Sequence, residues 1–361
     1  MGKFSQVVAA VRLARLRYLS IMVTPFVCGF VASGNDDYAY LALGTVAVIA
    51  YQFVTSVGNC LSDRTEDQVD YPERTSLFEE VTYAGLRNLV IACCVIYMAI
   101  VATMAFALDI QLDTIGFWVL YLVGTLVYSF ARVKTKTFGP PILLGSLSAA
   151  LAWVGYWGFH DALSWTEGVH LERFLHLDIG GVLTGPAALI GPAVLVMWIF
   201  GGSLCGSKDV PNLAGDAAIG YESIYLKIVR GPYAMFRVVA VMSLPYLGAL
   251  VFVVAGYPQP SPWVLVAYPL AWVFAAILTR ASKQTEFELV RELGYVYWQI
   301  FMTLILFSLD PSGLMATILL ASLGWWLVMS RGLHCDPTLI KTENFSAVGA
   351  ILRPTNSVAS E

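Results

Sequence analysis

Three oxygen-bearing side chains are regularly spaced in the segment 59–70, NCLSDRTEDQVD, where a long apolar stretch ends: Asn59, Asp63 and Asp67. On an α-helix, residues at i, i+4 and i+8 share one face, so the three side chains would present their oxygens together. Acids at the edge of a membrane span are costly to place there and by default mark a functional site. The spacing therefore predicts a site for a hard cation such as Mg²⁺, which prefers oxygen ligands.

A second acidic segment, SKDVPNLAGD at 207–216, follows another long apolar stretch. It holds Asp209, Asn212 and Asp216, with Lys208 directly ahead of Asp209, and the first segment holds Arg64 beside Asp63. Mg²⁺ usually binds through one or two carboxylates together with substrate phosphate oxygens, and Arg and Lys bind the remaining phosphate oxygens. A diphosphate held between the two acidic segments meets both demands.

A basic segment lies between them, YSFARVKTK at 128–136. Tyr128 and Ser129 offer hydroxyls, and Arg132, Lys134 and Lys136 offer cations. The segment either contributes to the same anion site or anchors the chain at the inner membrane face, where Lys and Arg accumulate. The residues alone leave both readings open.

The elements that position these segments are membrane helices. The 361 residues are 58% hydrophobic and only 13% charged, and the mean hydropathy is +0.71, which is far from a soluble domain. Apolar runs that can cross a hydrocarbon core of roughly 30 Å occupy 18–33, 40–61, 88–108, 115–131, 140–158, 183–205, 236–256, 262–279, 294–309 and 313–330. Either of the last two can lie partly in the interface, which would leave nine crossings.

We therefore expect an all-α, polytopic bundle of nine or ten transmembrane helices around a central cavity. Residues 1–330 would form a single membrane domain, and 331–361 a flexible cytoplasmic tail. With the N-terminus inside, the predicted inner segments carry all but one, Arg173, of the 21 lysines and arginines. This predicts a multi-pass protein of the cell membrane, with both acidic segments cytoplasmic and no cleavable signal peptide.

Other classes of site receive little support. The net charge of −4 gives no reason to expect a nucleic-acid partner. The six cysteines form no CxxC pair, so we expect neither disulfides nor zinc. Three of the four histidines, His160, His170 and His176, share one outer loop, which reads more simply as a solvated segment than as a metal site.

A diphosphate site above an apolar bundle suits an amphiphile whose tail enters the bundle, such as an isoprenyl diphosphate. Its ionisation to an allylic cation requires fixed positive charge at the leaving diphosphate. Aromatic rings can stabilise the cation through their π faces. The chain is 13% aromatic, which ordinary membrane packing also explains.

The motifs resemble those of the UbiA superfamily of intramembrane prenyltransferases. The first acidic segment resembles the NxxxDxxxD motif of that family, and 208–216, KDVPNLAGD, is similar to its second motif in the form KDxPDxxGD. The YS and lysine segment at 128–134 also matches, and the three occur in the family's order after the second, fourth and sixth predicted spans. The resemblance implies a helical bundle with a central cavity and magnesium-dependent transfer of a prenyl group.

Residue roles follow from the resemblance. It implies that one Mg²⁺ is bound by Asn59, Asp63 and Asp67, and a second by Asp209, Asn212 and Asp216. It further implies that the donor diphosphate is contacted by Arg64, Tyr128, Arg132, Lys134 and Lys208. Asp63, Asp67, Asp209 and Lys134 would be the catalytic residues.

An early arginine of the family corresponds to Arg15 or Arg17, although an inner-face flank also explains both. Two departures stand out. Asn212 replaces an aspartate and Ala214 a frequent glutamate, which lowers the negative charge of the second metal site. After Arg74 the continuation also differs from the family's usual one, which favours a divergent member that acts in secondary metabolism.

Three functions remain open on the sequence. The first is prenyl transfer to an acceptor, most simply an electron-rich aromatic ring. The second is cyclisation of the prenyl chain itself, by a membrane terpene cyclase of the same superfamily. The third is ion-coupled transport, for which we would expect charges near the midplane and broken helices rather than acids at span ends. Prenyl chain length, acceptor identity and oligomeric state are not encoded in these motifs.

Overall fold

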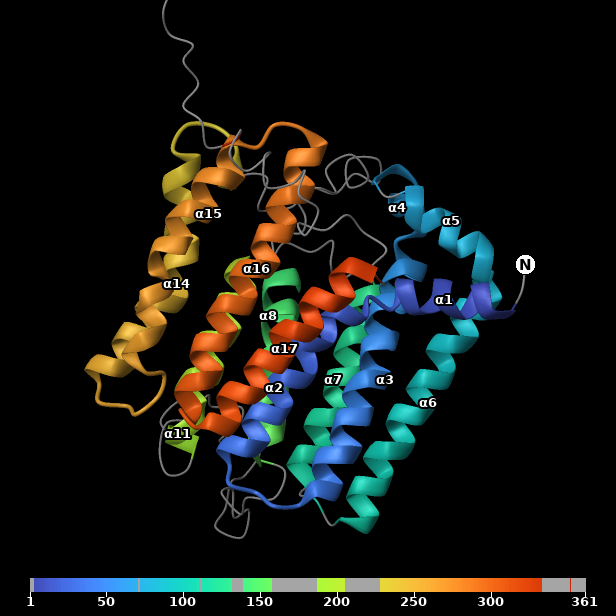
Figure 1. Cartoon of the computed structure of the whole chain (residues 1–361), viewed down its shortest axis with the longest axis horizontal. Coiled ribbons are helices and arrows are strands. Elements are labelled where there is room, and N and C mark those ends of the chain that lie inside the picture. The colour runs from blue at the N-terminus through green and yellow to red at the C-terminus, as the bar shows by residue number, and fades with distance from the viewer. Residues whose placement is uncertain are drawn as a thin grey trace, which may run out of the picture.

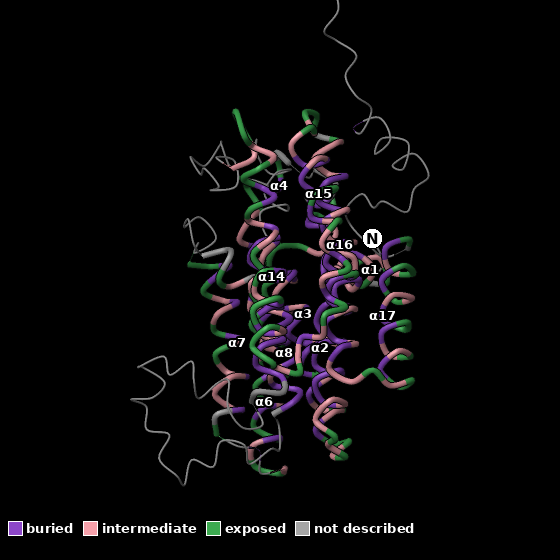
Figure 2. Tube along the Cα trace, turned by 90° about the vertical axis from the view of Figure 1, so that its left-hand side faces the viewer, coloured by how far each residue is buried: buried purple, intermediate pink, exposed green. Residues whose placement is uncertain are grey.

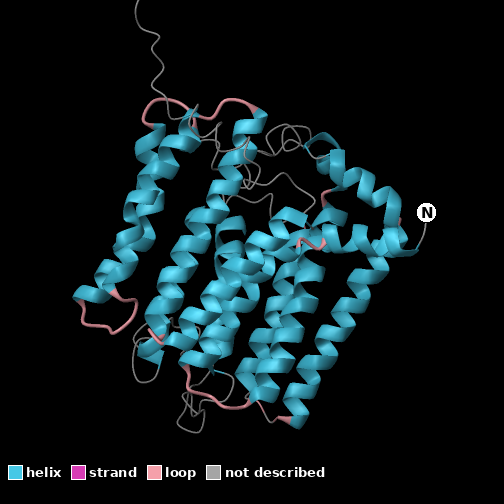
Figure 3. Ribbon diagram, in the orientation of Figure 1, coloured by secondary structure: helices cyan, strands magenta, loops and turns pink. Residues whose placement is uncertain are grey.

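The computed structural model describes residues 3–70, 72–108, 110, 112–131, 139–157, 187–204, 228–332 and 351. Within these residues every regular element is a helix (Figure 3). The elements are α1 (Lys3–Leu13), η1 (Leu16–Tyr18), α2 (Leu19–Ala32), α3 (Tyr38–Ser62), α4 (Arg64–Asp70), α5 (Pro72–Val81), α6 (Tyr83–Ala107), α7 (Leu112–Phe130), α8 (Gly139–Trp157), α11 (Ala187–Leu204), α14 (Ala234–Val254), η6 (Pro262–Ala267), α15 (Tyr268–Arg280), α16 (Gln284–Leu309) and α17 (Gly313–Gly332).

The predicted all-α class is correct, and each of the ten apolar runs contains a described helix. Six described helices are long and apolar enough to cross a bilayer, and η6 with α15 counts as one of them. The protein is thus a multi-pass membrane protein, whereas a total of nine or ten crossings stays a prediction. So does the division at residue 330, because nearly all of 331–361 lies outside the described residues.

Helix α16 begins ten residues earlier than its apolar run predicts, at Gln284 rather than 294. Its first turns carry Arg291 and Glu292, which are both buried. Glu292 accepts two hydrogen bonds of 2.7 Å from the guanidinium of Arg17, one to each carboxylate oxygen. The charges that end the apolar run in the sequence are therefore paired inside the bundle.

The long helices run side by side, and the two short helices α4 and α5 follow the end of α3 (Figure 1). The connection from α15 to α16 lies at the same end of the bundle as α4, and we call this the α4 end. Helix α1 lies across the direction of the long helices and packs against α5 (Figure 1). The segments around Arg64 and Lys283 thus share one end, as the charge distribution predicts; which membrane face that end meets remains a prediction.

Helix α8 is held by glycines on two sides. A Cβ atom on Gly29 of α2 would lie 2.2 Å from the carbonyl oxygen of Ala152, and one on Gly155 would lie 2.1 Å from that of Phe26. On its other side, a Cβ on Gly145 would lie 2.6 Å from the carbonyl oxygen of Trp198 in α11. Small residues let membrane helices approach to backbone contact, so α2, α8 and α11 form a close-packed wall.

Burial falls from the centre of the bundle to its outside. The span in α3 is 56% buried, whereas those in α6 and α17 are each 28% buried. Figure 2 shows exposed residues along the outer sides of α17 and α7 and buried ones along α2 and α3. The exposed faces carry large apolar side chains such as Phe106 and Val254, as expected of a surface that meets lipid.

Aromatic rings pack together in one part of the interior. Tyr51, Tyr97, Trp118, Phe26 and Tyr40 form a chain of contacts with successive ring centroids 6.2, 5.9, 5.7 and 5.7 Å apart. Each of the five side chains is at most 1% exposed. Tyr97 and Tyr40 donate hydrogen bonds of 2.8 Å to the carbonyl oxygens of Trp118 and Val154. We call this group the aromatic plug.

Candidate functional site

The first acidic motif lies where α3 ends. Asp63 is the C-terminal cap of α3, and its backbone departs from the helical region, so the single helix predicted for 59–67 is interrupted there. The helical hydrogen bonds nevertheless continue across the break, from the amide of Asp63 to the carbonyl of Asn59 at 2.9 Å and from that of Asp67 to the carbonyl of Asp63 at 2.7 Å. The i, i+4, i+8 relation is therefore kept locally although α4 is a separate helix.

Asn59 and Asp63 are in direct contact. The side-chain amide of Asn59 donates to one carboxylate oxygen of Asp63 at 2.9 Å, and the hydroxyl of Ser62 donates to the other at 2.6 Å. Both donors orient the carboxylate at the end of α3. The pair offers carboxylate and amide oxygens, the ligand types that suit a hard divalent cation.

Asp67 lies on α4 and is 4% exposed. One of its carboxylate oxygens accepts a hydrogen bond of 2.8 Å from Arg74 on α5, and this ion pair joins the two short helices. Arg64, the predicted diphosphate contact in this motif, is exposed on the first turn of α4. Asp67 thus has a structural contact in addition to its predicted role as a metal ligand.

A cavity of about 200 Å³ extends from this end of α3 into the bundle. Helices α3 and α7 each present one stripe of residues to it. The stripe of α3 comprises Tyr51, Gln52, Thr55, Ser56 and Asn59, and that of α7 comprises Leu120, Tyr121, Gly124, Thr125, Tyr128 and Ser129. Both sets have the spacing i, i+1, i+4, i+5 that one helix face provides.

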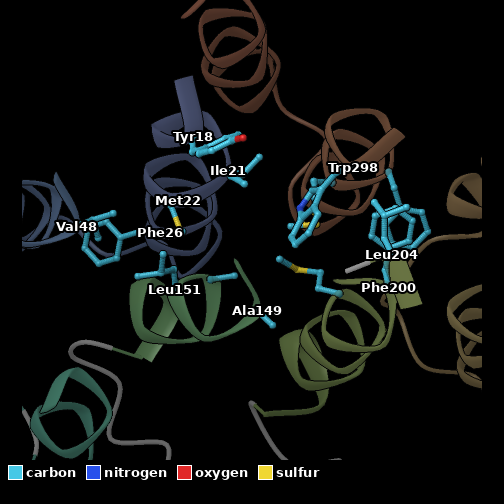
Figure 4. Close-up of a cluster of buried hydrophobic side chains, with 14 of the residues drawn as sticks. Tyr18, Ile21, Met22, Phe26, Val48, Ala149, Leu151, Phe200, Leu204 and Trp298 are labelled. Carbon is cyan, nitrogen blue, oxygen red and sulfur yellow. The ribbon is translucent and has the colours of Figure 1, made fainter. Parts of the chain in front are cut away.

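The opposite wall of the cavity is apolar and aromatic. Tyr18, Ile21 and Met22 come from η1 and α2, and Tyr295 and Trp298 come from α16. Figure 4 shows Tyr18, Ile21 and Met22 along one side of their helix, with Trp298 turned toward the same interior region. The cavity thus combines hydroxyl and amide groups near the α4 end with an apolar interior, a common form of small-molecule site.

Tyr128 is the one predicted diphosphate contact that lines the described part of the cavity together with Asn59. It stands two residues before the end of α7, so its hydroxyl belongs to the α4 end of the bundle. The structure therefore brings together Tyr128 of the basic segment and Asn59 of the acidic motif, which are 69 residues apart in the sequence. This agrees with the shared site that the motifs predict.

Arg15 and Arg17, the two candidates for the early arginine of the family, have different surroundings in the structure. Arg15 lines the cavity from the corner between α1 and η1, where its backbone is left-handed with a φ of 51°. Arg17 is buried against Glu292, and its guanidinium also lies over the rings of Tyr18 and Tyr295 at 4.9 and 5.1 Å. Of the two, only Arg15 borders the cavity, and Arg17 holds α16 to the start of α2.

Six predicted site residues lie outside the described residues: Arg132, Lys134, Lys208, Asp209, Asn212 and Asp216. The histidines His160, His170 and His176 lie outside them as well. Among the residues that the structure describes, no group of three or more His, Cys, Asp or Glu side chains gathers at one place. The ligand sets for two Mg²⁺ ions therefore stay predictions.

The sequence motifs singled out Tyr128 among the tyrosines of the cavity, but not Tyr51 or Tyr121. Tyr51 and Tyr121 lie in apolar runs, where membrane packing is the simpler expectation for an aromatic residue. The signal that was available is the repeat of hydrogen-bonding side chains at 51, 52, 55, 56 and 59, which continues the stripe of Asn59 backward along α3. The stripe at 121, 125 and 128–129 repeats it on α7.

The fold and the site define an all-helical, multi-pass membrane protein with an interior cavity whose polar end adjoins an acidic motif. Residues 21–290 match the UbiA prenyltransferase family, and the chain belongs to this family, as its motifs predict. Its general activity is accordingly prenyl transfer. A search of curated proteins finds no match.

Two solved structures are similar to the chain. A structure of digeranylgeranylglyceryl phosphate synthase in membranes is 13% identical with a TM-score of 0.53, covering 87% of this chain and 99% of that one. A UbiA homolog from Archaeoglobus fulgidus bound to DMAPP and Mg²⁺ is 16% identical with a TM-score of 0.44, covering 81% and 99%. At this identity the first of them supports a shared fold.

Proposed function

We propose that the protein transfers an isoprenyl group from a prenyl diphosphate to an electron-rich aromatic acceptor in a reaction that requires Mg²⁺. The observation that carries this proposal is the cavity, which joins the acidic motif at the end of α3 to an apolar interior large enough for a small ligand. A prenyl diphosphate has the same two-part chemistry, with an anionic head and an apolar chain.

In this proposal the diphosphate lies at the α4 end. Asn59, Asp63 and Asp67 supply oxygen ligands for one Mg²⁺, and Asp209, Asn212 and Asp216 supply those for a second. The metal ions neutralise charge on the leaving diphosphate. Arg15, Arg64 and Tyr128, with Arg132, Lys134 and Lys208, contact the remaining oxygens. Asp67 keeps its ion pair with Arg74, which fixes α4 relative to α5.

The reaction breaks the bond between C1 of the prenyl group and the diphosphate oxygen, and the electron pair leaves with the diphosphate. The allylic carbon, now electron-poor, forms a new bond with a carbon of the aromatic acceptor. The acceptor ring then loses the proton at that carbon to water at the polar end of the cavity. The rings of Tyr18, Tyr295 and Trp298 line the cavity and can stabilise the cation through their π faces.

The membrane setting completes the proposal. The distribution of Lys and Arg supports a cytoplasmic position for the α4 end, where a water-soluble diphosphate is available. Helix α1 lies across the bundle near this end, as an interfacial helix does (Figure 1). The departures from the family motifs at Asn212, at Ala214 and after Arg74 favour a role in secondary metabolism.

The test is release of pyrophosphate from the purified protein in lipid, fed geranyl, farnesyl or geranylgeranyl diphosphate. Each donor is supplied with and without a panel of phenols and aromatic acids, in Mg²⁺ or in EDTA. We expect release that requires both Mg²⁺ and an acceptor. Release without acceptor, together with a cyclic hydrocarbon, would establish a cyclase instead. No release under any condition would overturn the proposal and favour transport.

A further inference from the structure

Of the residues that line the cavity from α3 and α7, those farthest from the acidic motif include two stacked rings. The centroids of Tyr51 and Tyr121 are 4.2 Å apart with an interplanar angle of 25°. The hydroxyl of Tyr121 donates to the carbonyl oxygen of Leu147 at 2.9 Å, and that of Tyr51 is hydrogen-bonded to the hydroxyl of Thr125. Each ring is thus tied to a neighbouring helix, and we call the pair the cavity floor.

The residues behind the cavity floor are buried and closely packed. Tyr51 is also the first ring of the aromatic plug, and Tyr97, Trp118 and Phe26 follow it with at most 1% exposure each. A close-packed interior does not admit further methylene groups without moving side chains or backbone. A chain that runs from the α4 end straight down between α3 and α7 therefore meets the floor.

The distance from the acidic motif to the cavity floor determines how long a prenyl chain the cavity can hold. Asn59 and Tyr51 are eight residues apart on α3, which corresponds to about 12 Å along the helix axis. A geranyl chain spans a comparable distance when extended, and farnesyl and geranylgeranyl chains exceed it by one and two isoprene units. The volume of about 200 Å³ is likewise small for a long chain.

Resting on the proposed function, we propose that Tyr51 and Tyr121 determine donor specificity, and that the enzyme uses a short prenyl diphosphate, geranyl or dimethylallyl, in preference to farnesyl and geranylgeranyl diphosphate. The lining fits this occupant, because Ile21, Met22 and Leu147, which border the cavity, are apolar. The floor acts by exclusion and takes no part in the chemistry.

The first experiment compares kcat/KM for the four donors, with one acceptor and Mg²⁺. We expect geranyl diphosphate to exceed geranylgeranyl diphosphate by at least about tenfold, since methylene groups that a pocket does not accommodate are discriminated to that extent. Turnover that is equal or faster with geranylgeranyl diphosphate would overturn the length assignment while leaving prenyl transfer intact. No turnover with any donor would instead count against the proposed function.

The second experiment moves the floor. Tyr121→Ala removes one ring and should raise the rate with farnesyl diphosphate, relative to that with dimethylallyl diphosphate, at least about tenfold. Tyr121→Phe is the matched control, because it keeps the ring and removes the hydroxyl with its hydrogen bonds to Leu147 and Met22; its donor preference should equal that of the parent. An unchanged preference in folded Tyr121→Ala would overturn the proposal.

If Tyr121→Ala does not fold, Gly124→Leu provides a second route, since Gly124 lines the cavity one turn above the floor. A Cβ there would meet only the side chain of Leu143, at 3.9 Å, so the change fills space without a backbone clash. We expect it to shorten the accepted chain toward dimethylallyl diphosphate. An unaltered ratio of geranyl to dimethylallyl turnover would contradict the assigned path of the chain.

Discussion

Helices α3 and α7 run through two halves of the same bundle and are used differently in each. Toward the α4 end they carry Thr55, Ser56, Asn59, Tyr128 and Ser129, which border a cavity. Toward the other end they carry Tyr40 and Trp118, which belong to the aromatic plug. The comparison shows two uses of the same helices: small polar side chains of α3 and α7 border open space in one half, and large rings pack against one another in the other.

This division of one bundle into a binding half and a packing half implies separate effects of mutation. Changes in the binding half should lower activity without lowering stability, whereas changes in the packing half should do the reverse. Four variants test the division, from the largest expected effect to the smallest.

Asp63→Ala should have the largest effect. It removes the carboxylate at the end of α3 that we assign to Mg²⁺, and loss of such electrostatic stabilisation costs at least about 10²-fold in turnover. The thermal unfolding midpoint should change little, because the hydrogen bonds that Asp63 accepts from Asn59 and Ser62 stay within the last turns of α3. Pyrophosphate release and a melting curve on the same sample check both.

The matched control for Asp63→Ala is Glu79→Ala, which removes an exposed carboxylate from α5. We expect it to be nearly silent in both measurements. Full activity in Asp63→Ala would contradict the metal assignment, and a loss in Glu79→Ala would show that general negative charge matters rather than the motif.

Trp118→Ala should be the most destabilising change in the packing half. The ring is 1% exposed and contacts both Tyr97 and Phe26, so truncation leaves a cavity that costs about 3–5 kcal/mol. Phe106→Ala is the control, since Phe106 is 92% exposed on α6. Unfolding of the two proteins in the same detergent gives the comparison, and equal midpoints would mean that the plug does not stabilise the bundle.

Gly155→Leu should be destabilising by about 1–3 kcal/mol or more, because a side chain there must separate α8 from α2. Gly324→Leu in α17 is the control, since a Cβ at Gly324 meets nothing within 4 Å. Similar midpoints for the two variants would show that the contact between α2 and α8 is not as close as described.

Arg15→Ala should have the smallest of the four effects. We expect a rise of about tenfold in KM for the donor with a lesser change in kcat, as for loss of one charge-assisted contact to a diphosphate. Arg12→Ala, one helical turn earlier in α1, is the control, because Arg12 is not among the residues that line the cavity. An unchanged KM in Arg15→Ala would remove Arg15 from the site.

The sequence predicted the helices and the acidic motif at the end of α3 because both depend on local spacing. The helix break at Asp63 was not predicted, since it accompanies contacts made elsewhere in the chain: Asp67 pairs with Arg74 and joins α4 to α5. The early start of α16 escaped prediction for a similar reason. From the sequence alone, Glu292 is expected to be a surface charge. Its burial depends on pairing with Arg17, which lies near the other end of the sequence.

The cavity floor could not be predicted at all. Tyr51 and Tyr121 are 70 residues apart, and neither lies in a motif. Their stacking depends on how α3 and α7 pack, and on Leu147 of α8 for a hydrogen bond. A hydropathy profile does not distinguish either tyrosine from the other residues of a membrane span. The aromatic plug has the same origin, since its rings come from four different helices.

The pairing of Arg17 with Glu292 has a consequence for how the protein is made. The two residues are 275 positions apart, so a ribosome has synthesised most of the chain before the partner of Arg17 exists. Until then the guanidinium is costly to bury, and the start of α2 is best left at the water interface. Arrival of α16 removes that cost. The ion pair thus couples the start of the first membrane helix to one of the last, and a nascent chain that still lacks α16 holds Arg17 without the carboxylate of Glu292.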